Sequence, residues 1–307
     1  MRKHLWAIVF SVCLLSFTVY ISLDTFVLAQ TYQENATELN TSVFEDASST
    51  EPSSEPSTST NTSTASDAQT NAYSDDNMSI ALSTYTANDT TVYVADVTLN
   101  SAQYLKTAFA NDTYGKNVTA TTSDMASAHD AVLAINGDNY GSREQGYVIR
   151  NGIVYRDTAD DSDVLCVYAD GSFEIVDPAT VSANQLVEQG VWQAFSFGPA
   201  LIEDGVVSVS QNDEVGRAKA SNPRTAIGII DKNHYVFVVS DGRTDESEGL
   251  SLYQLAQFMQ QLGVTCAYNL DGGGSSTMVF QGAVVNNPTS GGNRIKERSV
   301  NDIVYIG

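Results

Sequence analysis

The first 80 residues restrict where a folded domain can lie in this chain. Arg2 and Lys3 precede an apolar run from Leu5 to Ile21, which is typical of a signal peptide or an uncleaved signal anchor. Residues 31–80 are rich in Ser, Thr and acidic residues and nearly free of apolar ones, so they cannot bury enough surface to offset the entropy of ordering. We therefore expect a leader at 1–30, a disordered stalk at 31–80 and a single globular domain at 81–307.

The basic residues before the apolar run also predict on which side of a membrane the domain lies. Because Arg and Lys favour the inner side, the N-terminus stays inside and the rest of the chain is sent outward. Val27, Leu28 and Ala29 fit the small-residue rule for signal cleavage only loosely, which leaves a secreted and a membrane-anchored form open. The domain is expected to be extracytoplasmic in both forms.

Net charge and cysteine content exclude two classes of protein. With a net charge of −22 the chain repels nucleic acid at long range, so no nucleic-acid partner is expected. An anionic substrate would therefore need a local cluster of arginines. Cys13 lies in the leader, which leaves Cys166 and Cys266 as one possible pair or as two buried free thiols, and a disulfide-rich scaffold is excluded.

Apolar patterning after the stalk predicts a mixed domain. Residues 91–99 alternate like a strand, and two hairpins are indicated, one turning at Asp170-Gly171 and one at 231–233. The clearest helix is 251–262, with Ser251 and Gln254 as a capping box and Gly263 after it. Further expected elements are a helix at 101–110, a helix with Ser123 as its N-cap, a strand at 131–135 and a short strand before Asn269. We expect an α+β fold, a mainly antiparallel sheet core with a few packed helices.

The stretch from Asn269 to Phe280, NLDGGGSSTMVF, places three glycines between apolar segments. Glycine loses the most conformational freedom on folding, so a tight turn or a close approach of the backbone to a ligand must require it. A phosphate loop is excluded because no Gly-Lys-Ser/Thr follows, and a nucleophile elbow because Gly-x-Ser-x-Gly is absent. A dinucleotide fingerprint is excluded because a helix should follow, whereas TMVF looks like a strand. The spacing fits equally a hairpin turn and a loop whose N–H groups and hydroxyls bind anionic or polyol oxygens.

Three carboxylates at predicted strand ends are candidates for catalysis. Asp138, Asp241 and Asp271 each follow an apolar run, and glycoside chemistry typically uses two carboxyl groups beside the scissile bond. Asp-Gly pairs are also common in turns, which is the favoured interpretation of Asp241 taken alone. The Asn, Tyr and Ser residues around Asp138 and Asp271 favour a functional role for those two.

Arginines near predicted strand ends are candidates for holding phosphate. Arg224 enters a buried strand, where a guanidinium could bind phosphate through two hydrogen bonds. Arg243 and Arg298 are weaker candidates. In so acidic a chain, each of them could instead pair with a neighbouring carboxylate.

Histidines limit two other kinds of chemistry. The chain has His4, His129 and His234, so a zinc site with several histidines is not expected. A serine hydrolase built on Ser196 in AFSFG is disfavoured, because His4 lies in the leader and His234 opens an apolar strand. No cofactor is predicted, although an Asp-rich chain still allows a carboxylate-bound Ca²⁺.

Several segments of the globular part follow one another in a characteristic order. They are AINGDNYG, GYVIRNGIVYR, FSFGPALIEDG, NPRTAIGI, VVSDGR, GLSLYQLAQFMQQLGVTCAYNLDGGGSSTMVFQGAVVNNP and ERSVNDIVYIG. Together they resemble the phosphodiester glycosidase family, whose bacterial members are often labelled exopolysaccharide biosynthesis proteins. The resemblance covers roughly residues 87–307, and NLDGGGSS in company with NPRTAIG gives it most of its specificity.

The resemblance implies an α+β domain with one cleft that cleaves a sugar-1-phosphodiester, releasing the sugar and leaving a phosphomonoester. Many members carry NGG where this chain has NGDNYG, so Asp138 would be a subgroup feature. The site positions implied are Asn136, Gly137, Arg224, Asp241, Gly242, Asn269, Asp271, Gly272, Gly273, Ser275 and Ser276. Of these Asp271 and Arg224, together with Asp138, are predicted to be catalytic, and the others to bind substrate.

The residues and the resemblance lead to one hypothesis for the mechanism. Arg224 and the N–H groups of the loop that carries Gly272, Gly273 and Gly274, the glycine loop, would hold the phosphate. Asp271 would act as acid or base at the glycosidic oxygen. Asn136 and Asn269 would orient sugar hydroxyls or the phosphate. The expected partners are a phosphosugar or envelope polysaccharide substrate and, through the N-terminal segment, a membrane. The alternative is a non-catalytic envelope module that binds or assembles polysaccharide.

Overall fold

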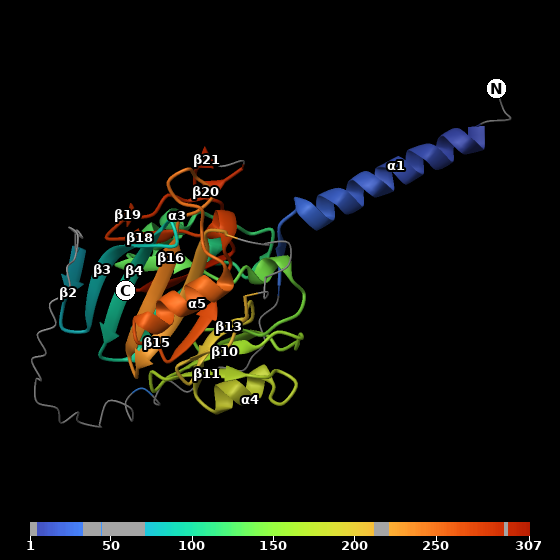
Figure 1. Ribbon diagram of the computed structural model, residues 1–307. Coiled ribbons are helices and arrows are strands. Elements are labelled where there is room, and N and C mark those ends of the chain that lie inside the picture. Colours follow the sequence, from blue (N-terminus) through green and yellow to red (C-terminus); the bar gives the residue numbers. More distant parts are fainter. Residues whose placement is uncertain (1–4, 33–43, 45–70, 212–220, 292–293) are drawn as a thin grey trace, which may run out of the picture.

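The computed structural model describes residues 5–32, 44, 71–211, 221–291 and 294–307. Most of the predicted stalk lies outside these residues. The described part is built from three antiparallel sheets, helices against their outer faces, and one long helix at the N-terminus (Figure 1).

The largest sheet has eight strands in the order β14-β13-β17-β15-β16-β4-β3-β2. Their bounds are, in that order, Val206–Val207, Ala200–Glu203, Cys266–Asn269, Arg224–Asp231, His234–Ser240, Thr90–Leu99, Met78–Ala87 and Asn71–Ser74. Every strand pair described in it is antiparallel. The predicted hairpin around 231–233 is its β15–β16 pair, and Asn233 at the turn has a φ of 60°.

Two five-stranded sheets complete the body. One has the order β19-β18-β7-β22-β5, with bounds Ala283–Val284, Met278–Phe280, Leu133–Asn136, Asp302–Ile306 and Leu105–Phe109. The other has the order β11-β10-β12-β8-β9, with bounds Phe173–Val176, Val164–Tyr168, Val191–Phe195, Val148–Arg150 and Ile153–Arg156. The turn of its β10–β11 hairpin lies at Asp170-Gly171, as predicted. Two short ladders pair β1 (Gln30–Thr31) with β6 (Gly115–Lys116) and β20 (Thr289–Ser290) with β21 (Arg294–Ile295).

A shared apolar core joins the three sheets. Its largest cluster includes Phe237 of β16, Ile135 of β7 and Phe195 of β12, one strand from each sheet, and all three side chains are fully buried. Burial of this apolar surface is the main favourable contribution to folding. The predicted α+β fold with a mainly antiparallel core is confirmed.

Three helices cover the outer faces of the sheets. They are α5 (Leu252–Gln261) on the eight-stranded sheet, α3 (Thr122–Ala128) on the β7–β22 region and α4 (Ala183–Glu188) on the β8–β12 region. The capping box of Ser251 and Gln254 is present as predicted. The N-cap of α3 is Thr121, two residues earlier than expected, while the Ser123 hydroxyl donates to Glu297 instead.

One predicted helix and one predicted boundary were wrong. Residues 101–110 form a single 3₁₀ turn, Ala102–Tyr104, and then strand β5, because Leu105–Phe109 pairs along its whole length with β22 and this tertiary pairing outweighs local propensity. The stalk was drawn too long, since Asn71–Ser74 and Met78–Ala87 are strands of the large sheet. Ile80 lies in the core and is only 1% exposed. The average composition of residues 31–80 does not reveal a single buried residue of this kind.

The N-terminal helix α1 spans Leu5–Phe26 and projects from the body (Figure 1). Its length and apolar composition suffice to cross a membrane, a property that signal sequences share. The chain that follows is fixed to the domain: the Asn117 side-chain amide donates to the Leu28 carbonyl at 2.9 Å, and the Tyr32 N–H donates to the Tyr114 carbonyl at 3.0 Å. Residues 31 and 32 therefore belong to the folded body and not to a stalk.

Candidate functional site

Strand ends from two sheets meet at one edge of the molecule. Because β15 runs antiparallel to both β16 and β17, its first residue, Arg224, lies opposite Ser240, and Ala226 lies opposite Asn269 at the end of β17. In the neighbouring sheet β7 ends at Asn136. The Asn136 side-chain amide donates to the Asp271 carbonyl at 2.6 Å, which joins this strand end to the glycine loop. The fold thus gathers segments that are far apart in the sequence.

A cavity of about 220 Å³ opens at this edge. It is lined by Phe197, Asn222, Arg224, Arg243, Asn269, Asp271, Gly272, Gly273, Gly274 and Arg298. Five predicted site residues are among them: Arg224, Asn269, Asp271, Gly272 and Gly273. The other predicted positions lie behind the cavity wall, where the contacts described below show what they hold in place.

Asp271 is the carboxylate that faces this cavity. One of its oxygens, Oδ2, accepts from the Ser275 hydroxyl at 2.5 Å and from Arg298 Nη2 at 2.6 Å. Arg298 Nε also donates to Ser275 Oγ at 2.9 Å, so the three side chains form a closed triangle. These contacts fix Asp271 in one orientation, and none involves its other oxygen, Oδ1.

Burial determines the protonation behaviour of Asp271. Removal of the carboxyl from water raises its pKa above the ordinary value, and this effect outweighs the opposing charge of Arg298 and the hydrogen bonds from Ser275 and Arg298. A carboxyl with a raised pKa in a cavity is a recurrent feature of acid–base catalysts.

Three arginines give the cavity a positive character in an otherwise acidic protein. Arg224 Nε donates to the Leu250 carbonyl at 2.8 Å, and Arg243 Nη2 donates to Asn222 Oδ1 at 2.9 Å. Arg298 is held by Asp271 and Ser275, with 46% of its side chain exposed. Three guanidinium groups against one carboxylate among the described lining residues make the arginine cluster that an anionic substrate requires.

The glycine loop lies against the start of β15. The Gly273 N–H donates to the Pro223 carbonyl at 2.8 Å. Gly273 has a φ of 62°, and a Cβ at this residue would lie 2.8 Å from Arg243 Nη2. A Cβ at Gly272 would lie 2.9 Å from the Pro223 oxygen. Gly272 is thus required by close packing on the Pro223 backbone, and Gly273 by its left-handed φ next to Arg243, which lines the cavity. The Ser275 and Ser276 N–H groups bond to loop carbonyls, so of the loop N–H groups those of Gly272 and Gly274 are the ones that we expect to meet a ligand.

Two asparagines have different roles from one another. Asn136 is fully buried, with Oδ1 accepting from the Thr225 hydroxyl at 2.9 Å, and it positions the loop without lining the cavity. Asn269 lines the cavity, and its amide donates to the Gly198 carbonyl at 2.8 Å. Its Oδ1 is buried and has no hydrogen-bond partner among the described residues. An unpartnered acceptor at the cavity wall is available for a donor group of a ligand.

A buried charge cluster lies beneath the site. The Arg150 guanidinium donates to Asp138 Oδ1 at 2.7 Å and to Asp302 Oδ2 at 2.8 Å, and all three side chains are at most 2% exposed. Burial raises the pKa of Asp302, against the lowering effect of Arg150. Gly137 packs on this cluster, and its carbonyl accepts the Asp271 N–H at 3.3 Å. The cluster therefore supports the backbone that carries Asp271.

Asp138 and Asp241 do not face the cavity. Asp138 Oδ1 is bonded to Arg150 and Oδ2 accepts the Ser196 N–H at 3.0 Å, so both oxygens are engaged in the interior. Asp241 accepts from the Asn287 N–H at 2.7 Å and from the Asn287 amide at 2.9 Å. This geometry favours supporting roles for both. Three carboxylates were expected to converge on one rim. Of these three, only Asp271 is among the described residues that line the cavity.

The remaining predicted positions are also supports. A Cβ at Gly242 would lie 2.7 Å from Pro223, so glycine is needed where β16 ends against the start of β15. Ser275 holds Asp271, and the Ser276 carbonyl accepts from the Asn286 amide at 2.9 Å. Substrate contact by these side chains stays a prediction.

Replacing Gly137 with alanine is expected to disturb the site. The new Cβ would lie 2.2 Å from Asp302 Oδ1, and relief of this clash moves the carbonyl that holds Asp271. We expect a destabilisation of about 1–3 kcal/mol, as for other overpacked interiors, measured by chemical denaturation. The control is Gly205→Ala, where no atom lies within 4 Å of the new Cβ and the cost is that of a left-handed φ alone. Equal losses in the two variants would contradict this account.

The structure does not support a serine hydrolase at Ser196. The Ser196 hydroxyl donates to the Tyr147 carbonyl at 3.1 Å. His129 contacts Asp112 and His234 contacts Asp96, both pairs away from Ser196, while His4 lies outside the described residues. The described residues contain no cluster of three metal-ligating His, Cys, Asp or Glu side chains, so the structure identifies no position for a Ca²⁺ ion. Cys166 and Cys266 are both free.

Some cavity residues ranked low as candidates from the sequence, and others were not singled out there. Arg243 and Arg298 were weaker candidates because nothing in the local pattern shows that their chain segments reach the cavity. Asn222 lies in the quoted NPRTAIGI stretch, directly before the proline, and could have been found there. Phe197 lies between β12 and β13 and carries no local signal.

Comparison with known proteins gives a consistent result. The model of the phosphodiester glycosidase family matches residues 129–307, more than half of the chain. The SPbeta prophage-derived uncharacterized protein YomE of Bacillus subtilis is 28% identical over 199 residues, which are 63% of this chain and 30% of that protein. The mouse N-acetylglucosamine-1-phosphodiester alpha-N-acetylglucosaminidase is 31% identical over 120 residues, 38% of this chain and 23% of the enzyme. The chain thus spans less than a third of the length of these relatives.

Solved structures share the fold. The catalytic domain of the zebrafish N-acetylglucosamine-1-phosphodiester alpha-N-acetylglucosaminidase superposes with a TM-score of 0.59 at 17% identity, covering 91% of this chain and 87% of that one. A hypothetical protein from Synechocystis gives a TM-score of 0.60 at 14% identity, covering 79% of this chain and 64% of that one. The family model, the curated relatives and the fold agree with the motifs at the cavity, and the chain belongs to the phosphodiester glycosidase family.

Proposed function

We propose that this protein is a hydrolase that cleaves the bond between a sugar and the phosphate of a sugar-1-phosphodiester. The observation that carries the proposal is the cavity in which Asp271 faces Arg224, Arg243 and Arg298. An arginine cluster binds a phosphodiester, and Asp271, a carboxylate of raised pKa, supplies acid–base chemistry next to it. Membership of the family and the activity named for the mouse relative support the same reaction class.

The chemistry needs little from the protein on the leaving-group side. A phosphomonoester is a stable anion, so the arginines can stabilise its developing charge without a full proton transfer. The remaining task is to activate water. Asp271 in its ionised form removes a proton from a water molecule as the water oxygen forms a bond to the anomeric carbon. The bond from that carbon to the phosphate oxygen breaks, and the proton resides on Asp271.

A pH profile follows from this role. Because burial raises the pKa of Asp271 and a base must be ionised, kcat/KM is expected to fall on the acid side with a midpoint above about 3.9, the ordinary aspartate value. Arg298 opposes that rise by favouring the charged form. Arg298→Gln should therefore move the midpoint to higher pH, in addition to weakening phosphate binding. The measurement is kcat/KM against pH for both proteins, and a midpoint that stays or moves to lower pH contradicts the role of Asp271 as base.

The N-terminal helix supports an extracytoplasmic location, with the domain either secreted or anchored at a membrane. Arg2 and Lys3 precede the apolar helix in the sequence, and basic residues at that end favour the orientation that keeps the N-terminus inside. A phosphosugar or polysaccharide of the cell envelope would then be within reach of the domain. These features support a role at the cell envelope. We propose that this role belongs to exopolysaccharide metabolism.

Turnover distinguishes this proposal from a module that only binds polysaccharide. The full chain, purified in detergent, is incubated with methyl phosphodiesters of N-acetylglucosamine, glucose, galactose and mannose linked through C1, and free sugar is quantified. Release of sugar from at least one of them, lost in Asp271→Asn, is the expected result. Saturable binding of these compounds with no release from any would favour the binding module.

A further inference from the structure

A second cavity, of about 380 Å³, lies next to the proposed active site. It is lined by Gln30, Tyr32, Tyr114, Arg143, Glu144, Tyr155 and Arg156. We propose that this cavity is a saccharide-binding site that holds a sugar unit of the substrate beyond the one whose bond is cleaved. The proposal rests on the proposed function for the identity of the substrate, but the binding it predicts can be measured without turnover.

The aromatic side chains form one wall of the cavity. The rings of Tyr32 and Tyr155 flank that of Tyr114, with centroid distances of 5.2 Å and 5.1 Å. Tyr114 is 7% exposed, while Tyr32 and Tyr155 are half-buried and also line the cavity. Tyrosines that present an apolar ring face together with a hydroxyl suit a ligand with both kinds of surface, as a sugar ring has.

Charged and amide groups face these rings. Arg156 is 9% exposed, and its guanidinium bonds go to the carbonyls of Gly146, Tyr140 and Arg143, with no carboxylate partner within the described ranges. A buried cation of this kind attracts ligand oxygens into the cavity. Glu144 and Gln30 supply acceptors, so donors and acceptors surround the aromatic wall as sugar hydroxyls require.

One pair of side chains connects the two cavities. The Arg143 guanidinium lies 5.0 Å from the centre of the Phe197 ring, and Phe197 lines the proposed active site while Arg143 lines the second cavity. Arg143 Nη1 also donates to the Ser196 carbonyl at 3.1 Å. The two cavities are therefore neighbours, which is what a ligand longer than a single phosphosugar would need in order to occupy both. This favours an oligosaccharide or polysaccharide phosphodiester over a small one.

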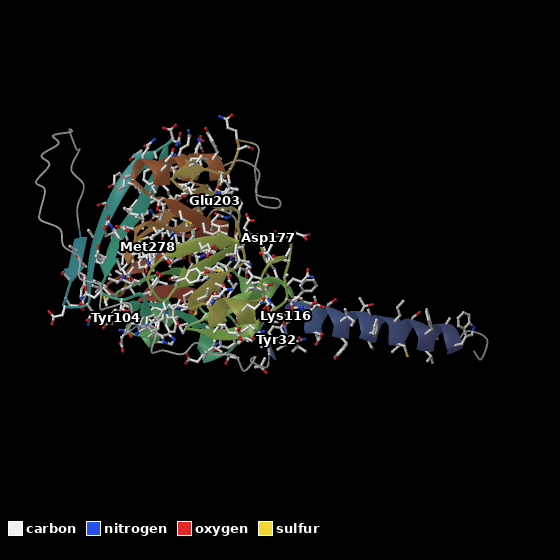
Figure 2. The ribbon with its side chains drawn as sticks, turned by 90° about the horizontal axis from the view of Figure 1, so that it is seen from below. Tyr32, Tyr104, Lys116, Asp177, Glu203 and Met278 are labelled. Carbon is white, nitrogen blue, oxygen red and sulfur yellow. The ribbon has the colours of Figure 1, made fainter. Side chains whose placement is uncertain are left out.

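The segment that follows the apolar helix completes the second cavity. Gln30 pairs with Lys116, and Figure 2 shows Tyr32 and Lys116 where α1 joins the body. Gly115 is required at this ladder because a Cβ there would lie 2.1 Å from the Gln30 carbonyl oxygen. The chain thus maintains a close contact that places Tyr32 over the cavity.

The test is equilibrium binding to the full chain carrying Asp271→Asn, so that no substrate is consumed. A panel of mono-, di- and trisaccharides of neutral and acidic hexoses and N-acetylhexosamines is screened by saturation-transfer NMR, and dissociation constants are then measured by titration. At least one saccharide is expected to bind. Tyr32→Ala is expected to weaken it about tenfold through loss of the ring contact. Arg143→Gln, a milder change, is expected to weaken binding in the same direction.

The control is Tyr253→Ala, which removes a half-buried tyrosine from α5 and should leave saccharide binding unchanged. Circular dichroism checks the fold of each variant. The proposal is overturned if no saccharide of the panel binds, or if Tyr32→Ala and Arg143→Gln bind as tightly as the control. Weaker association of Tyr32→Ala with phosphatidylglycerol vesicles, at unchanged saccharide affinity, would assign the tyrosines to a membrane surface and also overturn it. Saccharide binding without any hydrolysis would overturn only the proposed function.

Discussion

Asp271→Asn is expected to lower kcat for a sugar-1-phosphodiester by about 10²–10⁴-fold, the usual contribution of a positioned general base. Asparagine has nearly the same shape as aspartate, but its amide cannot take the proton of the attacking water. The side chain lies in the triangle with Ser275 and Arg298, and the amide oxygen can still accept from both. The effect should therefore appear in turnover while the circular dichroism spectrum is unchanged.

The matched control for Asp271→Asn is Asp96→Asn. Asp96 has 51% of its side chain exposed and contacts His234, so the same chemical change is made outside the site. This variant should retain wild-type kcat. A loss of less than threefold in Asp271→Asn would show that the carboxylate is not required for chemistry and would leave the arginines with the loop N–H groups as the catalytic groups.

The largest effect on stability is expected from Arg150→Met, at about 3–5 kcal/mol. The substitution leaves Asp138 and Asp302 buried without a cation. Removing the partner of a buried charge costs far more free energy than an ion pair at the surface contributes. Arg150 also lies 4.5 Å from the centre of the Phe195 ring. Chemical denaturation followed by circular dichroism measures the free energy of unfolding.

Two further variants test the cause of that loss. Lys232→Met breaks an ion pair to Asp170 whose side chains are 60% and 44% exposed, and should cost at most about 1 kcal/mol. Adding Asp138→Asn and Asp302→Asn to Arg150→Met removes the unpaired charges and should restore part of the lost stability. Equal losses in the free energy of unfolding for Arg150→Met and Lys232→Met would contradict this explanation. So would a further loss of stability when the two Asp→Asn substitutions are added to Arg150→Met.

Much of the fold was predictable because its signals are local. The hairpin turns and the capping box depend on residues within a few positions of one another, and they were found where predicted. The helix expected at 101–110 failed because β5 is determined by its pairing with β22, almost 200 residues away in the chain. The stalk boundary failed because strand β2 lies in a mostly polar stretch and is determined by its pairing with β3, whose Ile80 and Leu82 face the core.

The site was predictable only in part, for a similar reason. The glycine loop and Arg224 carry local patterns, and both line the cavity. Asp138 has an equally suggestive pattern, but its oxygens are bonded to Arg150 and to the Ser196 N–H, contacts that no local sequence shows. Arg298 reaches Asp271 although the two are 27 positions apart in the chain. Which acid faces the cavity is a property of the packed fold.

The central claim is that water attacks the sugar and that the arginines retain the phosphate, and isotope labelling tests it most directly. The full chain is allowed to hydrolyse a sugar-1-phosphodiester in water enriched in ¹⁸O, and mass spectrometry locates the label before the released sugar exchanges its anomeric oxygen. Cleavage between carbon and oxygen, with the label in the sugar and a phosphomonoester free of it, is the expected result. Label in the phosphate would show attack at phosphorus and would contradict a glycosidase mechanism at Asp271.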